Sequence, residues 1–154
     1  GRGGQCDRAV GLLRELPSLG KQPDGYTYTA AISACAEAAD ADRALLLLSE
    51  MRGAGLKLST LPFSKAIAAC EKAGCWREAV ATYDEISSEG LPHNALTTNL
   101  VLRACFAAGE AQSAITLLRS TVLDEAVVGR GGADEETTHL ATQLLELGAS
   151  DGSV

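Results

Sequence analysis

The five cysteines carry the most reactive side chains of this chain, and three of them are evenly spaced. Cys35, Cys70 and Cys105 lie 35 residues apart. Thiolates could bind a metal ion, but each sulfur would have to lie about 2.3 Å from it, and stacked repeats hold equivalent atoms farther apart. The odd number of cysteines also argues against a disulfide framework. We therefore predict three small buried side chains in a reducing compartment, and no metal site.

The other polar residues form no arrangement that is typical of an enzyme. His93 and His139 are isolated, and no paired cysteines accompany a His and Glu as in a zinc deaminase. No glycine motif would cradle a phosphate, and no nucleophile has a plausible base. The sequence predicts no catalysis and no cofactor, so we expect the function on a surface.

The 35-residue spacing extends beyond the cysteines. Three further sets repeat at the same interval: Ile32, Ile67 and Leu102; Ala44, Ala79 and Ala114; and Gly20, Gly55 and Gly90. A fixed period of this length indicates a solenoid, in which each unit packs only against its neighbours. Within one period, two apolar stripes at helical spacing are separated by a short turn. We predict an all-α solenoid of stacked antiparallel helix-turn-helix repeats.

The register also gives the boundaries of the units. The first residues match only the second half of a unit, so residues 5–19 are expected to form a lone second helix that Pro17 ends early. Gly55 and Gly90 follow second helices, where a left-handed C-terminal cap favours glycine. The predicted units are a partial repeat at 1–24, repeats at 25–59, 60–94 and 95–129, and a C-terminal capping helix with a polar tail at 130–154.

Length, hydropathy and charge narrow the function classes. No apolar run approaches the roughly 18 residues of a membrane span. The only methionine is Met51, so the chain is expected to be processed or part of a longer protein. The net charge is −7, of which residues 130–154 contribute −4. An acidic chain is a poor partner for a polyanion, because such affinity comes largely from Lys and Arg.

Several segments resemble the pentatricopeptide repeat (PPR) family, whose 35-residue helical hairpins end in a Gly, a short extended step and Pro-Asp. Here GKQPD at 20–24 precedes GYTYTAAISAC at 25–35, and related starts are PFSKAIAAC at 62–70 and LTTNLVLRAC at 96–105. The tetratricopeptide family repeats every 34 residues and lacks that junction. The resemblance covers about residues 5–129, although Leu-Ser and His-Asn replace Pro-Asp at the later junctions.

This resemblance implies a module that binds single-stranded RNA in a chloroplast or mitochondrion, with one base per repeat. Two short polar side chains can read the exposed edge of an unpaired base. By position, Thr29 with Ser59 would read one base, Ser64 with Asn94 the next, preferring a purine and adenine above all, and Asn99 a third. The same positions imply that Tyr26, Leu61 and Leu96 pack against base faces and that Lys72 faces phosphate.

Each of these residues also has a purely structural interpretation. Thr, Ser and Asn at helix starts are ordinary caps, each worth about 1 kcal/mol without a ligand. Tyr26 could pack on the preceding hairpin, and Lys72 could be a solvated lysine. Stacking contributes about 1–3 kcal/mol per base, against about 4–15 kcal/mol lost on association. Three repeats are therefore expected to bind RNA weakly.

A second hypothesis therefore stays open. The short array, the negative charge and the acidic residues 134–136 also suit an adaptor or structural subunit that binds proteins in an organellar complex, such as a ribosome or photosynthetic complex. The sequence leaves the RNA target, the protein partner, the organelle and the number of repeats in the full protein undetermined.

Overall fold

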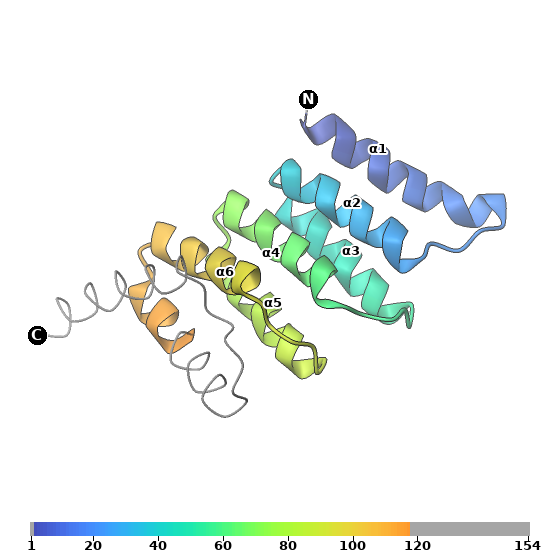
Figure 1. The fold of residues 1–154 in the computed structure, drawn as a ribbon. Helices are drawn as coiled ribbons and strands as arrows, with labels where there is room; N and C mark the ends of the chain where they lie inside the picture. Colours follow the sequence, from blue (N-terminus) through green and yellow to red (C-terminus); the bar gives the residue numbers. More distant parts are fainter. Residues whose placement is uncertain (1, 118–154) are drawn as a thin grey trace, which may run out of the picture.

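The computed structural model describes residues 2–117, and this part of the chain is helical, with no strand (Figure 1). The predicted all-α solenoid is confirmed. The predicted exit at 126–129 and the capping helix at 130–154 lie outside the described residues. The elements are α1 (Arg2–Glu15), the 3-10 helix η1 (Leu16–Leu19), α2 (Gly25–Glu37), α3 (Ala41–Gly53), α4 (Thr60–Ala73), α5 (Trp76–Ser88), α6 (Ala95–Ala107) and a helical segment at 111–117.

The helix ends follow from local side-chain chemistry. The Asp24 carboxylate accepts a hydrogen bond from the Thr27 amide at 2.8 Å and caps α2, and Asp40 caps α3 in the same way. The predicted left-handed caps are present, because Gly55 has φ +73° and Gly90 has φ +72°. The prediction for the first helix needs a correction. α1 already begins at Arg2, and the chain passes into a 3-10 helix around Pro17, whose fixed φ suits a first turn.

The turn inside each hairpin uses a left-handed residue at the same register. Gly74 and Gly109 take this position in the later units, with φ +77° and +75°. In the first unit it is Ala39, with φ +57°. A Cβ in this conformation costs about 1–2 kcal/mol, so the turn between α2 and α3 is the most strained of the three.

A single apolar core runs through α1 to α6 and the helical segment at 111–117. Its largest fully buried side chain is Phe63 on α4. Burial at every unit agrees with the predicted solenoid, because the helices α1 to α6 contact only elements of their own hairpin or of an adjacent one. Three of the repeated sets are completely buried: Cys35, Cys70 and Cys105; Ile32, Ile67 and Leu102; and Ala44, Ala79 and Ala114.

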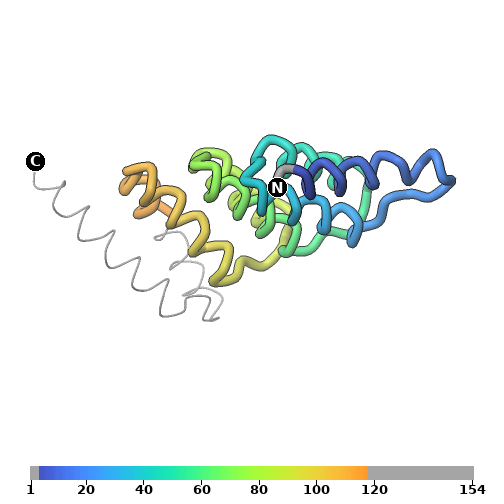
Figure 2. The backbone as a smooth tube through the Cα atoms, turned by 90° about the horizontal axis from the view of Figure 1, so that it is seen from above, coloured from blue at the N-terminus to red at the C-terminus, as the bar shows by residue number. Residues whose placement is uncertain are grey.

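The helices form two layers that differ in spacing. The first helices α2, α4 and α6 lie close to one another in sequence, whereas no Cα atoms of two successive second helices, α1 and α3 or α3 and α5, lie within 8 Å of each other. Closer spacing in one layer makes it the inner wall of a curved stack, so the first helices form the inner wall. Seen from above, the units advance in one direction from the N-terminal end (Figure 2). Within residues 2–117, no helix is long and apolar enough to cross a bilayer.

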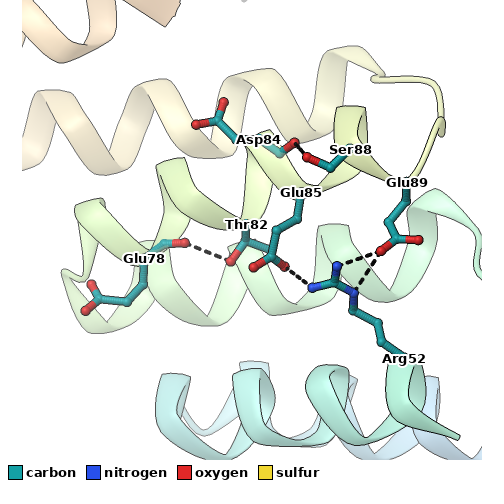
Figure 3. A network of polar contacts seen from close by, with 7 residues as sticks. All are labelled: Arg52, Glu78, Thr82, Asp84, Glu85, Ser88 and Glu89. Atoms are coloured by element: carbon teal, nitrogen blue, oxygen red, sulfur yellow. Dashed lines mark hydrogen bonds and ion pairs between the residues drawn. The ribbon is translucent and has the colours of Figure 1, made fainter.

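Ion pairs connect the second helices across their wider spacing. Arg14 on α1 makes a bidentate contact with Glu50 on α3, at 2.8 Å to each carboxylate oxygen. Arg52 on α3 reaches Glu85 at 3.0 Å and Glu89 at 2.6 Å, at the C-terminal end of α5 (Figure 3). These groups are partly exposed, so each pair adds at most about 1 kcal/mol to stability. Their clearer effect is on charge, because these arginines are neutralised on the outer wall.

Candidate functional site

Three large apolar side chains are exposed at one register of the inner wall. Tyr26, Leu61 and Leu96 lie in the first turns of α2, α4 and α6, and are 84%, 53% and 55% exposed. A single exposed leucine needs no explanation. Three at the same position of consecutive units form a line of apolar contact points, which is typical of a surface that binds a partner.

A pocket of about 380 Å³ opens between the starts of α2 and α4. It brings together four of the nine side chains that the sequence singled out. Tyr26 and Leu61 contribute the apolar surface, and Thr29 and Ser59 contribute hydroxyl groups. A flat ring could pack against the apolar pair while its polar edge meets the hydroxyls. The 35-residue register therefore places residues of two successive units in one cavity.

The two hydroxyls of this pocket differ in their hydrogen bonding. Thr29 Oγ1 donates to the carbonyl oxygen of Gly25 at 2.7 Å, which leaves its lone pairs as acceptors. Ser59 occupies the N-cap of α4 but makes no capping hydrogen bond with its side chain. The Ser59 hydroxyl is thus available to a ligand as donor or acceptor.

The next predicted pair is arranged differently. Ser64 is 3% exposed and donates to the carbonyl of Thr60 at 3.2 Å. The Asn94 side chain caps α6 in a reciprocal capping box with Thr97. Asn99 is 4% exposed. Asn94 is exposed with its side chain engaged in this cap, whereas Ser64 and Asn99 are buried, so reading by Ser64 with Asn94 stays a prediction.

The lysines were only partly anticipated from the sequence. Lys72 is exposed in the last turn of α4 and does not line the pocket, whereas Lys57 and Lys65 do. Lys57 lies in the extended junction before α4, and Lys65 follows Ser64 on α4. Neither lysine is repeated at the equivalent position of the other units, so the 35-residue period does not identify them. None of these three lysines has an ion pair within residues 2–117.

The difference in capping between Asn94 and Ser59 can be tested by measuring stability. We expect Asn94→Ala to lower the free energy of unfolding by about 1 kcal/mol, because the variant loses a cap that holds the Thr97 amide at 2.8 Å. Ser59→Ala should change it by less than about 0.5 kcal/mol, because no capping bond is lost. Urea unfolding followed by circular dichroism measures both. Equal losses would show that Ser59 is a cap in solution.

The buried thiols carry no sign of reactivity. Burial raises the pKa of Cys35 and of Cys70 to about 12, and that of Cys105 to about 11. A thiol is nucleophilic and binds metals as its thiolate, so these side chains act as small hydrophobic groups. Within residues 2–117, no cluster of three or more potential metal ligands is found.

Comparison with known proteins decides the family. A family model described as "Pentatricopeptide repeat-containing protein" matches residues 1–121. This chain belongs to the pentatricopeptide repeat family. No curated protein sequence matches it at a significant level.

Solved structures of PPR proteins share the fold. The crystal structure of the pentatricopeptide repeat protein PPR10 from maize matches 99% of this chain, with 27% identity and a TM-score of 0.71. PPR10 in complex with an 18-nucleotide psaJ RNA element matches 93%, also with 27% identity, and a TM-score of 0.67. This PPR chain spans only about a fifth of the length of those proteins, 23% and 20% respectively.

Proposed function

We propose that this chain is a non-catalytic PPR module that binds single-stranded RNA along the inner wall formed by α2, α4 and α6. The observation that carries the proposal is the pocket between α2 and α4, where Tyr26, Thr29, Ser59 and Leu61 of two successive units meet. Family membership and the RNA complex of PPR10 support it. We place the protein in a chloroplast or mitochondrion by the same resemblance.

The distribution of charge is compatible with RNA despite the net charge of −7. On the outer wall, Arg14 and Arg52 are paired with acids. At the pocket, Lys57 and Lys65 are present and no acidic residue lines the cavity. An RNA strand on the inner wall therefore meets unpaired cations while the acids lie mostly elsewhere. Affinity for phosphate depends on such local cations.

Binding is tested with the 154-residue chain and a fluorescent single-stranded RNA of mixed sequence. Tyr26→Ala should weaken binding about tenfold, because it removes one aromatic contact with a base. Leu46→Ala is the matched control, since Leu46 is 52% exposed on the second helix α3. Fluorescence anisotropy at low salt measures both affinities. The proposal fails if Tyr26→Ala binds as well as the unaltered chain, or if Leu46→Ala loses as much.

The protein-adaptor alternative has a different signature. Recovery of the chain in a complex with stoichiometric protein after nuclease treatment, together with no retention of RNA, would favour the adaptor and contradict the RNA proposal.

A further inference from the structure

We propose that Cys6 and Cys35 form an oxidisable dithiol, in which a peroxide joins the two sulfur atoms into a disulfide between α1 and α2. The inference does not depend on the proposed RNA-binding function. It assigns a reversible covalent modification to the interface between the partial repeat and the first complete repeat.

The two thiols contact each other inside this interface. Both side chains are completely buried, and α1 and α2 lie side by side (Figure 1). The thiols of Cys6 and Cys35 share a side-chain hydrogen bond. A disulfide requires the two Cβ atoms to lie about 3.5–4.5 Å apart, a separation that is within reach of thiols already in contact.

Arg43 on α3 connects the chain on both sides of the thiol pair. Its guanidinium forms an ion pair with Asp7, which follows Cys6, and a second one with Asp40 at 2.8 Å. The Asp40 amide donates to the carbonyl oxygen of Cys35 at 2.9 Å. The guanidinium also interacts electrostatically with both thiols. A positive charge beside a sulfur atom favours the thiolate, which is the form that attacks a peroxide.

This thiol pair occurs in one unit only. The residues equivalent to Cys6 in the next two units are Ala41 and Trp76, so Cys70 and Cys105 have no thiol at the matching position. The repeated cysteines therefore provide internal controls, because they share the register and the burial of Cys35 without its partner.

Cys70 with Cys75 is the competing pair. These two thiols interact electrostatically. The Cys75 thiol, however, donates to the carbonyl oxygen of Ala73, 4.0 Å away. The hydrogen bond between the thiols of Cys6 and Cys35 therefore favours the pair at the α1–α2 interface.

Oxidation requires α1 to separate from α2. Burial raises the pKa of Cys35 to about 12, so the closed interface keeps this thiol unreactive. Within residues 2–117, only η1 and α2 have Cα atoms within 8 Å of those of α1, whereas α4 lies among α2, α3, α5 and α6. A helix with few neighbours opens at a lower free-energy cost than a central one. Opening of α1 exposes Cys6 and Cys35 together, while the other buried thiols stay covered.

The chemistry is a two-electron oxidation by hydrogen peroxide. The Cys6 thiolate attacks one peroxide oxygen, so that an S–O bond forms, the O–O bond breaks and water leaves, giving a sulfenic acid. The Cys35 thiolate then attacks the Cys6 sulfur, the S–O bond breaks and a second water leaves. Both thiol protons end in the two water molecules, and the two electrons pass to the peroxide. A dithiol reductant reverses the reaction by thiol–disulfide exchange.

Mass spectrometry of the 154-residue chain tests the disulfide. The chain is treated with dilute hydrogen peroxide, denatured, alkylated with iodoacetamide and digested with trypsin without reductant. We expect three of the five cysteines to be alkylated and the tryptic peptides 3–8 and 22–43 to be joined. Dithiothreitol added before alkylation should restore all five thiols.

Serine variants and hydrogen exchange complete the test. Cys6→Ser and Cys35→Ser should each abolish the linked peptides, whereas the matched controls Cys70→Ser and Cys105→Ser should keep them. In the oxidised chain, the amides of α1 should exchange at least about tenfold more slowly, because the disulfide holds α1 on α2. A link between Cys70 and Cys75 instead, or five alkylated cysteines after peroxide treatment, would overturn the inference and leave the proposed RNA-binding function untouched.

Discussion

Replacing Leu47 by alanine is expected to lower the free energy of unfolding by about 2–5 kcal/mol, whereas Leu46→Ala should change it by less than about 0.5 kcal/mol. The two leucines are adjacent on α3, but Leu47 is 1% exposed and Leu46 is 52% exposed. The first variant leaves a cavity, and the second removes a side chain that is already half in water. Composition and helix propensity change equally in both.

The position of α3 should enlarge the effect of the cavity. α3 contacts both α2 and α4, so it joins one hairpin to the next. In a solenoid, stability is approximately the sum of units and nearest-neighbour interfaces. A cavity at such a junction is therefore expected to uncouple the segments on either side.

Urea unfolding followed by circular dichroism tests this pair of variants. Uncoupling would appear as a lower m-value in Leu47→Ala, because less surface is exposed in each cooperative step. Similar losses of unfolding free energy in Leu46→Ala and Leu47→Ala would contradict the assignment of Leu47 to the buried face of α3 and Leu46 to its exposed face. An unchanged stability of Leu47→Ala would contradict the continuous core.

The repeat period explains why the fold was predictable from the sequence. Three fully buried cysteines at one register fix the inward face of three helices at once, and Ile32, Ile67 and Leu102 do the same independently. When all units place apolar residues at the same position, the buried face of each helix is identified more clearly than from a single amphipathic helix. Helix bounds were less predictable, because capping and 3-10 geometry depend on a few local contacts. The start of α1 at Arg2 is one example.

The site was only partly predictable, for two physical reasons. A register assigns equal roles to Thr29 and Ser64, but their exposure depends on how closely the next hairpin packs, and Ser64 is buried. A comparison of equivalent positions also does not identify residues that occur in one unit only. Lys57 and Lys65 are such residues.

A contact between distant positions was also not predictable. The rings of Tyr83 and His93 stack with centroids 4.0 Å apart, and His93 Nε2 lies 2.6 Å from Ser87 Oγ. The residues 35 positions earlier are Leu48 and Leu58, so the two rings occur together in this unit alone and the period does not predict their contact. Their contact joins α5 to the junction before α6. The sequence alone had suggested no role for His93.

The repeated cysteines predict a loss of stability at alkaline pH. An unfolded thiol loses its proton near pH 8.5, whereas burial raises the pKa to about 12 for Cys35 and Cys70 and to about 11 for Cys105. Between these values the unfolded chain binds fewer protons than the folded chain, so stability falls as pH rises. The contribution of the thiols is complete below about pH 8.5 and is lost as pH approaches about 12.

Each thiol can add a slope of up to about 1.4 kcal/mol per pH unit within this window. Urea midpoints between pH 7.5 and 10.5, measured with reductant, give the total slope. A variant with alanine at Cys35, Cys70 and Cys105 should show a much flatter dependence, whatever its stability at pH 7.5. Cys75→Ala is the matched control, because Cys75 is only half-buried and should contribute less. If the triple variant keeps the original slope, groups other than these thiols govern alkaline unfolding.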